Sequence, residues 1–268
     1  MNPSPNSAAK SYATRIIGVA FFLLLWEMNS HFELFKIVAP NLPRKFFPSI
    51  LSIAPKLVAA VASGEYWLAL FRTVARCVAA FLLAALLGVS TGLLSARIRH
   101  LQDLLFLPTE FLRNLPAVAI IPFAIIAFGI GGSMKTAVAF FGCYFPVYLA
   151  TIEGLSSVNG TLIKTARAYN WKGRRLLFGV MLPAAMPQIF AALRVVLAIS
   201  LILVVISEMI VGGDGLGVRL VESERAFDFP TLYAETFLLG ILGVGFNIVL
   251  IVLNRTFYFW EDEKVWKA

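Results

Sequence analysis

Long apolar runs alternate with short polar segments along most of this chain. About 20 apolar residues are needed to cross the hydrocarbon core of a bilayer as a helix. On that basis we predict six transmembrane helices, at about residues 16–30, 66–94, 101–128, 132–155, 184–211 and 232–258. The second begins amphipathically, with Arg72 and Arg76 on one face. The third is interrupted by Pro108, Pro116 and Pro122. The pattern therefore predicts an all-α membrane protein.

The N-terminal region differs from the rest of the chain in its composition. Lys10 and Arg15 precede the first apolar run, which is typical of a signal peptide or of an uncleaved first span. We favour the uncleaved span, because no small-x-small cleavage pattern follows soon after the run. We predict three regions: residues 1–62, a first span and a Pro-rich outer segment; residues 63–260, the main membrane-spanning core; and residues 261–268, a C-terminal tail.

Composition and charge agree with a multi-pass membrane protein. Hydrophobic residues make up 59% of the chain and charged residues only 14%, whereas soluble domains carry about 25% charged residues. The net charge of +8 is also typical of nucleic-acid-binding proteins. Here we attribute it to basic residues retained in cytoplasmic loops and near lipid headgroups, and we expect no nucleic-acid partner.

Basic residues in the tight turns set the expected orientation. Arg97 and Arg99 lie in one turn between apolar runs. A second turn carries Lys164, Arg167, Lys172, Arg174 and Arg175. Positive residues are enriched on the cytoplasmic side, so we expect both turns and both termini to be cytoplasmic.

No motif for chemistry or cofactor binding emerges from the sequence. The segment 129–136 has Met134 where a phosphate-binding loop needs glycine before its lysine, and the segment 212–217 lacks dinucleotide-binding spacing. We interpret both as turns. Cys77 and Cys143 lie within apolar runs and are expected to be small core residues. We therefore expect a non-catalytic subunit with no metal site, no catalytic residue and no cofactor of its own.

The segment 160–183 is the strongest functional candidate. It is basic and amphipathic, and it predicts a helix–turn–helix elbow between two apolar runs. Asn170 is able to adopt a left-handed conformation and end the first helix. Trp171 would then be free to fill a pocket on a partner, and Pro183 would begin the next helix. An interfacial loop held by lipid headgroups remains an alternative.

This elbow resembles the coupling motif of ABC-importer permeases. In that family the pattern is Glu-Ala-Ala, three residues, Gly, nine residues, then Ile-x-Leu-Pro. Here the same spacing runs through Lys164-Thr165-Ala166, Asn170 and Val180-Met181-Leu182-Pro183. Lysine thus replaces the family's glutamate, and asparagine replaces its glycine, which is a mild change if the turn needs a positive φ.

Other segments are similar to the subgroup of these permeases that serves taurine, alkanesulfonates, nitrate and bicarbonate. They are Leu112-Arg113-Asn114-Leu115-Pro116, Ile121-Pro122, Phe128-Gly129-Ile130-Gly131, Ala192-Leu193-Arg194, Ser207-Glu208-Met209 and Gly215-Leu216-Gly217. Together with the elbow, the resemblance covers about residues 66–260.

The resemblance implies a type I ABC-importer permease fold in the bacterial inner membrane, with a cytoplasmic coupling helix. It implies docking of a cytoplasmic ABC ATPase dimer, which binds the ATP, on Lys164, Thr165, Ala166, Arg167, Ala168, Asn170 and Trp171. It also implies a second copy of the permease, as a homodimer, and a periplasmic substrate-binding protein. The expected activity is ATP-driven import, by alternating access, of a small anionic solute such as a sulfonate, nitrate or bicarbonate. The sequence does not name the substrate.

Charged residues inside the predicted spans are candidates for the substrate pathway. Arg113, Asn114 and Glu208 are the residues we single out, with Glu208 near the outer end, where a gate would lie. Arg113 is also able to pair with Glu110, three residues before it, and to tie helix ends together. The alternative class is an ion-coupled secondary transporter or a channel working without an ATPase, which would need its own coupling carboxylates or pore.

Overall fold

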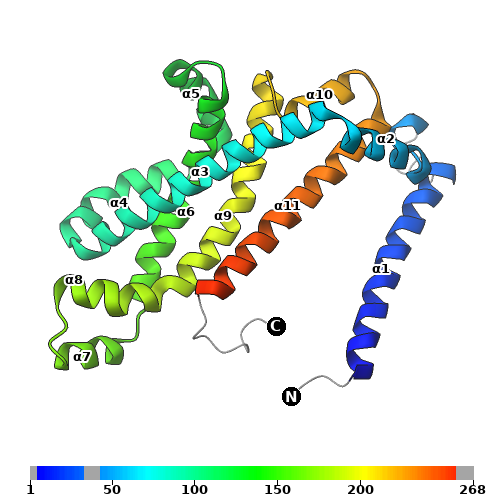
Figure 1. Ribbon diagram of the computed structural model, residues 1–268. Helices are drawn as coiled ribbons and strands as arrows, with labels where there is room; N and C mark the ends of the chain where they lie inside the picture. The colour runs from blue at the N-terminus through cyan, green and yellow to red at the C-terminus, as the bar shows by residue number, and fades with distance from the viewer. Residues whose placement is uncertain (1–4, 33–42, 258–268) are drawn as a thin grey trace. The chain divides into compact units, whose positions relative to one another are not determined.

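The computed structural model describes residues 5–32 and 43–257, which form helices joined by short turns (Figure 1). This confirms the predicted all-α class. The α-helices are α1 (Pro5–Phe32), α2 (Ile50–Ala62), α3 (Gly64–Arg97), α4 (Arg99–Arg113), α5 (Ile121–Phe128), α6 (Gly132–Ser156), α7 (Gly160–Ala168), α8 (Gly173–Leu176), α9 (Leu182–Val211), α10 (Leu216–Arg225) and α11 (Phe229–Phe257). Short 3-10 helices cover Arg44–Phe46 and Ala117–Ile120, and a π-helix, η4, covers Leu177–Met181.

Four helical segments in the described part of the chain are long and apolar enough to cross a membrane. They are Gly64–Arg97, Gly132–Ser156, Gly173–Val211 and Phe229–Val252. A fifth crossing would be the pair His100–Arg113 and Ala117–Phe128, which bends by 93° at its break. The apolar part of α1, Ile17–Phe32, is shorter than these spans. The described residues thus contain four or five spans of full length, and the first predicted span, which was expected to be short, is this shorter apolar helix.

The bend lies at one of the interruptions predicted for the third span. Residues 101–128 were expected to form one interrupted helix, but α4 ends at Arg113 and a 3-10 turn begins after Pro116. Proline has no N–H to donate and disfavours a helical conformation in the residue before it. Pro108 is accommodated inside α4, whereas Pro116 lies at the break between α4 and the 3-10 helix Ala117–Ile120.

The chain divides into two compact units. One contains residues 1–64 and 220–238, and the other contains residues 65–219 and 239–268. The predicted core included residues 220–238, which here group with the N-terminal segment instead. The predicted cytoplasmic tail, residues 261–268, lies outside the described residues.

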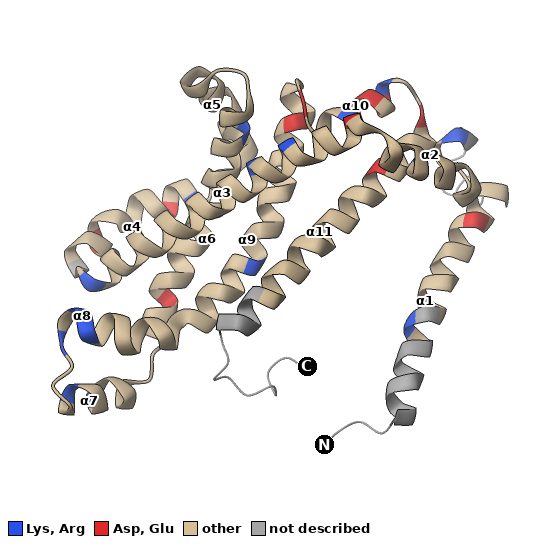
Figure 2. Cartoon of the chain, viewed as in Figure 1, with Lys and Arg blue, Asp and Glu red and all other residues tan. Residues whose placement is uncertain are grey.

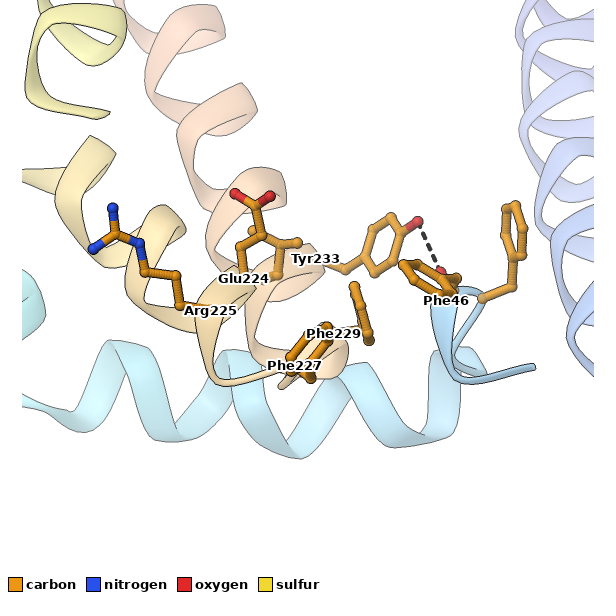
Figure 3. A pocket seen from close by; sticks show the side chains of 8 residues that line it. Phe46, Glu224, Arg225, Phe227, Phe229 and Tyr233 are labelled. Atoms are coloured by element: carbon orange, nitrogen blue, oxygen red, sulfur yellow. Dashed lines mark hydrogen bonds between the residues drawn. The ribbon is translucent and has the colours of Figure 1, made fainter. Parts of the chain in front are cut away.

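Aromatic side chains build the interior of the first unit around a cavity of about 560 Å³ (Figure 3). The rings of Phe46 and Phe229 lie 4.5 Å apart, centroid to centroid. The Tyr233 hydroxyl donates a hydrogen bond to the Phe46 carbonyl at 3.1 Å. Beside them Lys45 Nζ lies 4.5 Å from the centre of the Phe227 ring. These contacts tie the start of α11 to the segment that precedes α2.

In the second unit, α6 packs along α9, and α3 lies close against α6. Ala84, Cys143, Val147 and Val196 are fully buried together. Cys77 and Cys143 are both free and buried, which confirms the prediction that they are core residues. Small residues allow the close approach of membrane helices. On α3, a Cβ at Gly92 would lie 2.7 Å from the Thr151 Cβ of α6.

This packing predicts that Gly92→Ala destabilises the chain. The added methyl would also lie 3.0 Å from the Tyr148 carbonyl, so the two helices would have to separate. Overpacking of this kind costs about 1–3 kcal/mol, which a thermal unfolding scan in detergent would detect. The matched control is Gly18→Ala on α1, where an added Cβ meets nothing within 4 Å. Equal unfolding temperatures for the two variants would contradict the close α3–α6 packing.

Candidate functional site at the two ends of the helix bundle

The elbow begins as a short, well-terminated helix. At the C-terminus of α7, Asn170 has a φ of 59°. Its N–H donates to the Arg167 carbonyl at 2.9 Å, and the Trp171 N–H donates to the Ala166 carbonyl at 3.0 Å. These two bonds around a left-handed residue form a Schellman motif, which fixes the direction in which the chain leaves the helix. The left-handed conformation predicted for Asn170 is confirmed.

Trp171 packs against its own elbow. The turn at Asn170 carries the half-buried Trp171 ring back across the elbow, where a Cβ at Gly179 would lie 2.5 Å from the Trp171 Cζ3 atom. The Arg175 guanidinium lies 4.6 Å from the centre of the Trp171 ring. Trp171 therefore braces its own elbow. Its contact with a pocket on a partner stays a prediction.

The exposed surface of the elbow is formed by other residues. Ala166 is buried, at 9% exposure, and faces the elbow's own interior. The remaining predicted coupling residues are exposed: Lys164, Thr165, Arg167, Ala168 and Asn170. Tyr169, which the motif comparison did not single out, is the most prominent aromatic side chain there, at 76% exposure. Basic residues gather around α7 and α8 (Figure 2).

The opposite end of the same bundle holds a buried charge cluster, which we define as Thr73, Arg76, Lys135, Glu208 and Asp214. Arg76 Nη1 on α3 donates to Glu208 Oε1 on α9 at 2.7 Å. Arg76 Nη2 forms an ion pair with Asp214 in the α9–α10 loop. Lys135 Nζ on α6 donates to the backbone carbonyl of Asp214 at 3.0 Å. The cluster therefore joins three helices and a loop.

Glu208 is the centre of this cluster. Its side chain is fully buried, and both carboxylate oxygens accept from the Thr73 hydroxyl at 3.0 Å. Oε2 also accepts from the Gly217 N–H at 3.0 Å. A side chain at Gly215, whose φ is 115°, would collide with the Glu208 carboxylate. This explains why glycine stands on both sides of Leu216.

Lys135, on α6, binds the α9–α10 loop. Its ammonium donates to the Gly212 carbonyl at 2.7 Å and is almost fully buried. Gly212 and Gly213 have φ values of 77° and 93°, conformations that L side chains rarely adopt. The predicted glycine-rich turn is confirmed for residues 212–215, which wrap around the ammonium, whereas Leu216 and Gly217 begin α10.

Asp214 should make stability depend on pH. Burial raises the pKa of its carboxyl, but the hydrogen bond from Arg76 and the charges of Arg76, Lys135 and Arg72 together hold the pKa below its usual value. A depressed pKa contributes stability above the unfolded value of about 3.9, and that contribution is lost as pH falls through the folded value. The unfolding temperature should be flat from about pH 7 to 5 and fall below about pH 4. In Asp214→Asn the fall should be smaller, and an unchanged slope would contradict the assignment.

The three predicted pathway residues are not brought together. Arg113 pairs with Glu110 on the exposed surface of α4, with Nε and Nη2 donating at 2.7 and 2.6 Å, which confirms the predicted pairing. Asn114 Nδ2 donates to the Glu110 carbonyl at 2.6 Å. Glu208 instead lies in the buried charge cluster, with no free face. In the described part of the chain, no group of three His, Cys, Asp or Glu side chains could hold a metal ion.

The sequence analysis did not single out the partners of Glu208. Its ion-pair partner Arg76 and its hydrogen-bond donor Thr73 lie 132 and 135 positions away in the sequence. A signal was nevertheless present, since charged residues within or beside apolar spans need a partner of opposite sign.

With this geometry in hand, the comparisons define the class of protein. A family model described as "Binding-protein-dependent transport system inner membrane component" matches residues 84–259. The chain belongs to this family of ABC transporter permeases.

Curated relatives cover most of the chain. A probable ABC transporter permease of Brucella abortus (strain 2308) is 29% identical over 81% of this chain and 86% of its own length. The putative aliphatic sulfonates transport permease of Bacillus subtilis (strain 168) is 26% identical, covering 81% and 78%. The taurine transport system permease of Escherichia coli (strain K12) is 25% identical, covering 91% and 88%. These relatives confirm the predicted subgroup.

A solved structure supports the fold. One chain of the MetNI methionine ABC transporter, in an inward-facing conformation, matches with a TM-score of 0.60 at 19% identity, covering 73% of this chain and 99% of that one. This likeness confirms the predicted type I ABC-importer permease fold.

Proposed function

We propose that this permease forms half of the membrane pathway of an ATP-driven importer, and that the exposed surface of the elbow is the dock for a separate ATPase subunit. The observation that carries the proposal is the rigid, basic elbow with the spacing of the coupling motif. Its Schellman turn and its Trp171 brace hold it in one shape, and its charged side chains are left exposed.

The elbow is continuous with a long helix. Residues Gly173–Val211 form one uninterrupted helical segment through α8, η4 and α9. Movement of the elbow would be passed along α9 to Glu208 at its far end, where the buried charge cluster ties α9 to α3 and α6. In this proposal ATP binding favours one arrangement of the elbows, and the helices carry the preference to the other side of the membrane.

The proposed orientation places the elbow in the cytoplasm of a bacterium and the buried charge cluster at the periplasmic side. Five basic residues in the elbow support this orientation. A periplasmic binding protein would then deliver the solute near the cluster. A second copy of the chain would complete the pathway, and α11 offers Gly240 and Gly245, beside which the single chain leaves open space.

The proposed substrate is a small oxyanion. The named relatives include permeases for aliphatic sulfonates and for taurine. The fold alone does not choose among them, because one fold serves many ligands.

Reconstitution would test the proposed function. The chain is co-purified with its ATPase and binding protein, placed in liposomes, and assayed for uptake of labelled taurine, ethanesulfonate, nitrate and bicarbonate. We expect uptake of at least one of them with ATP and none with a non-hydrolysable analogue. Uptake that persists without the ATPase, driven by an ion gradient, would instead support a secondary transporter and overturn the proposal.

A further inference from the structure

Arg194, deep within α9, has no acidic partner among the described residues. Arg76 and Lys135 each face a carboxylate in the buried charge cluster, and Arg113 faces Glu110. Arg194 on α9 is different, because Nε donates to the Asn247 Oδ1 atom of α11 at 2.6 Å and no carboxylate among the described residues lies within ion-pair distance. A guanidinium has five N–H donors, so the Nη groups remain available.

Arg194 also lies deep in its helix. It is twelve residues after the start of α9 and seventeen before its end. At 1.5 Å per residue these separations are about 18 and about 26 Å. A positive charge at such depth is expensive in lipid and marks a functional site unless a partner neutralises it. Figure 2 shows how few charged residues α9 and α11 carry along their lengths.

The surroundings of Arg194 form a groove in the second unit. α9 and α11 enclose about 600 Å³ there, and Arg194 and Asn247 are its polar groups. The other lining side chains are apolar, among them Leu197, Ile202 and Phe246, and Gly243 leaves space on α11. An apolar groove with one convergent polar pair is the usual form of a small-molecule site.

We propose that this groove binds the oxyanion of the transported solute, with the Arg194 guanidinium as its anchor and Asn247 as the residue that positions the guanidinium. The assignment rests on the proposed function and names the substrate class and a pathway residue. Guanidinium donors match planar or trigonal oxygen groups in a bidentate manner, which suits sulfonate, nitrate or bicarbonate. Asn247 occupies Nε and leaves the Nη edge for the ligand.

The test separates an anion site from a tie between two helices. The complex of permease and ATPase is placed in phosphatidylcholine nanodiscs, and its unfolding temperature is titrated with sodium ethanesulfonate, nitrate or bicarbonate against sodium chloride of equal ionic strength. We expect at least one oxyanion to stabilise the wild-type complex. Arg194→Met should weaken the apparent affinity roughly 10- to 100-fold, the range expected for loss of a charge-assisted hydrogen bond.

Two further variants act as controls. Arg194→Lys keeps the charge and should retain partial binding, and Asn247→Ala keeps the guanidinium and should lose less affinity than Arg194→Met. If the pair is only a helix tie, Arg194→Met and Asn247→Ala should destabilise the complex equally and leave the anion response unchanged, which would overturn the proposal. Failure of all three anions to stabilise the wild type would overturn it as well.

A lipid control and an uptake assay complete the experiment. Nanodiscs containing phosphatidylglycerol test whether a lipid headgroup is the real ligand, and loss of the ethanesulfonate response in them would show that it is. Uptake separates this inference from the proposed function. ATP-dependent uptake that is unaffected by Arg194→Met would contradict the anion site alone. An Arg194-dependent anion response without ATP-dependent uptake would contradict only the proposed transport function.

Discussion

Replacing Arg76 with methionine is expected to lower the free energy of unfolding by about 3–5 kcal/mol. The change leaves the fully buried Glu208 carboxylate without its nearest cation, with hydrogen bonds from Thr73 and Gly217 only. Removing one member of a buried ion pair costs this much because the remaining charge is uncompensated. Denaturant or thermal unfolding of the purified permease in detergent would measure the loss.

A matched pair on the surface serves as the control. Arg113→Met breaks a bridge to Glu110 of similar length, but both side chains are exposed and screened by solvent, so the loss should be much smaller than at Arg76. In a double-mutant cycle, Arg76→Met combined with Glu208→Gln should cost less than the sum of the single changes. Equal effects at Arg76 and Arg113 would show that the buried charge cluster does not hold the helices together.

The second large effect is expected at the elbow. Tyr169→Ala should reduce ATP-dependent uptake about 30-fold or more, because a central exposed aromatic residue in an interface commonly contributes about 2 kcal/mol or more. Tyr169 makes no contact that the elbow needs for its own fold, as its 76% exposure indicates, so the unfolding temperature should not change. Uptake and ATPase activity of the reconstituted complex would be measured together.

The control for Tyr169 is an aromatic residue of similar exposure at the other end of the bundle. Phe71 on α3, at 70% exposure, meets this requirement, and Phe71→Ala should leave uptake coupled to ATP. Ala166→Arg is a poor substitute for Tyr169→Ala, because Ala166 is buried and the change would disturb α7 itself. Full transport by Tyr169→Ala would remove this residue from the proposed dock.

Several features of the fold could be predicted because they depend on local sequence. Apolar length predicts the spans that became α3, α6 and α9. Asn170 was predicted to be left-handed from its residue type and its place in the motif, and the geometry agrees. The glycines of residues 212–217 were predicted to form a turn for the same local reason.

The features that were missed depend on contacts distant in the sequence. The pairing of Arg76 with Glu208 joins residues 132 positions apart, and apolar periodicity carries no information on such a pair. The 93° bend between α4 and α5 depends on how Pro116 and its neighbours pack against the other helices. The contact of the Trp171 ring with Gly179 was also missed, because the sequence does not show that the chain folds back over this glycine.

Cross-linking tests the central proposal, that the elbow is the cytoplasmic dock of the ATPase, most directly. Cys77 and Cys143 are the two native cysteines and both are buried, so Tyr169→Cys would supply an accessible thiol on the elbow. We predict that this thiol cross-links to the co-expressed ATPase and reacts with a membrane-impermeant maleimide only when the cytoplasmic face is open to it. Labelling from outside intact cells, or an ATPase that co-purifies without any cross-link to this position, would contradict the proposal.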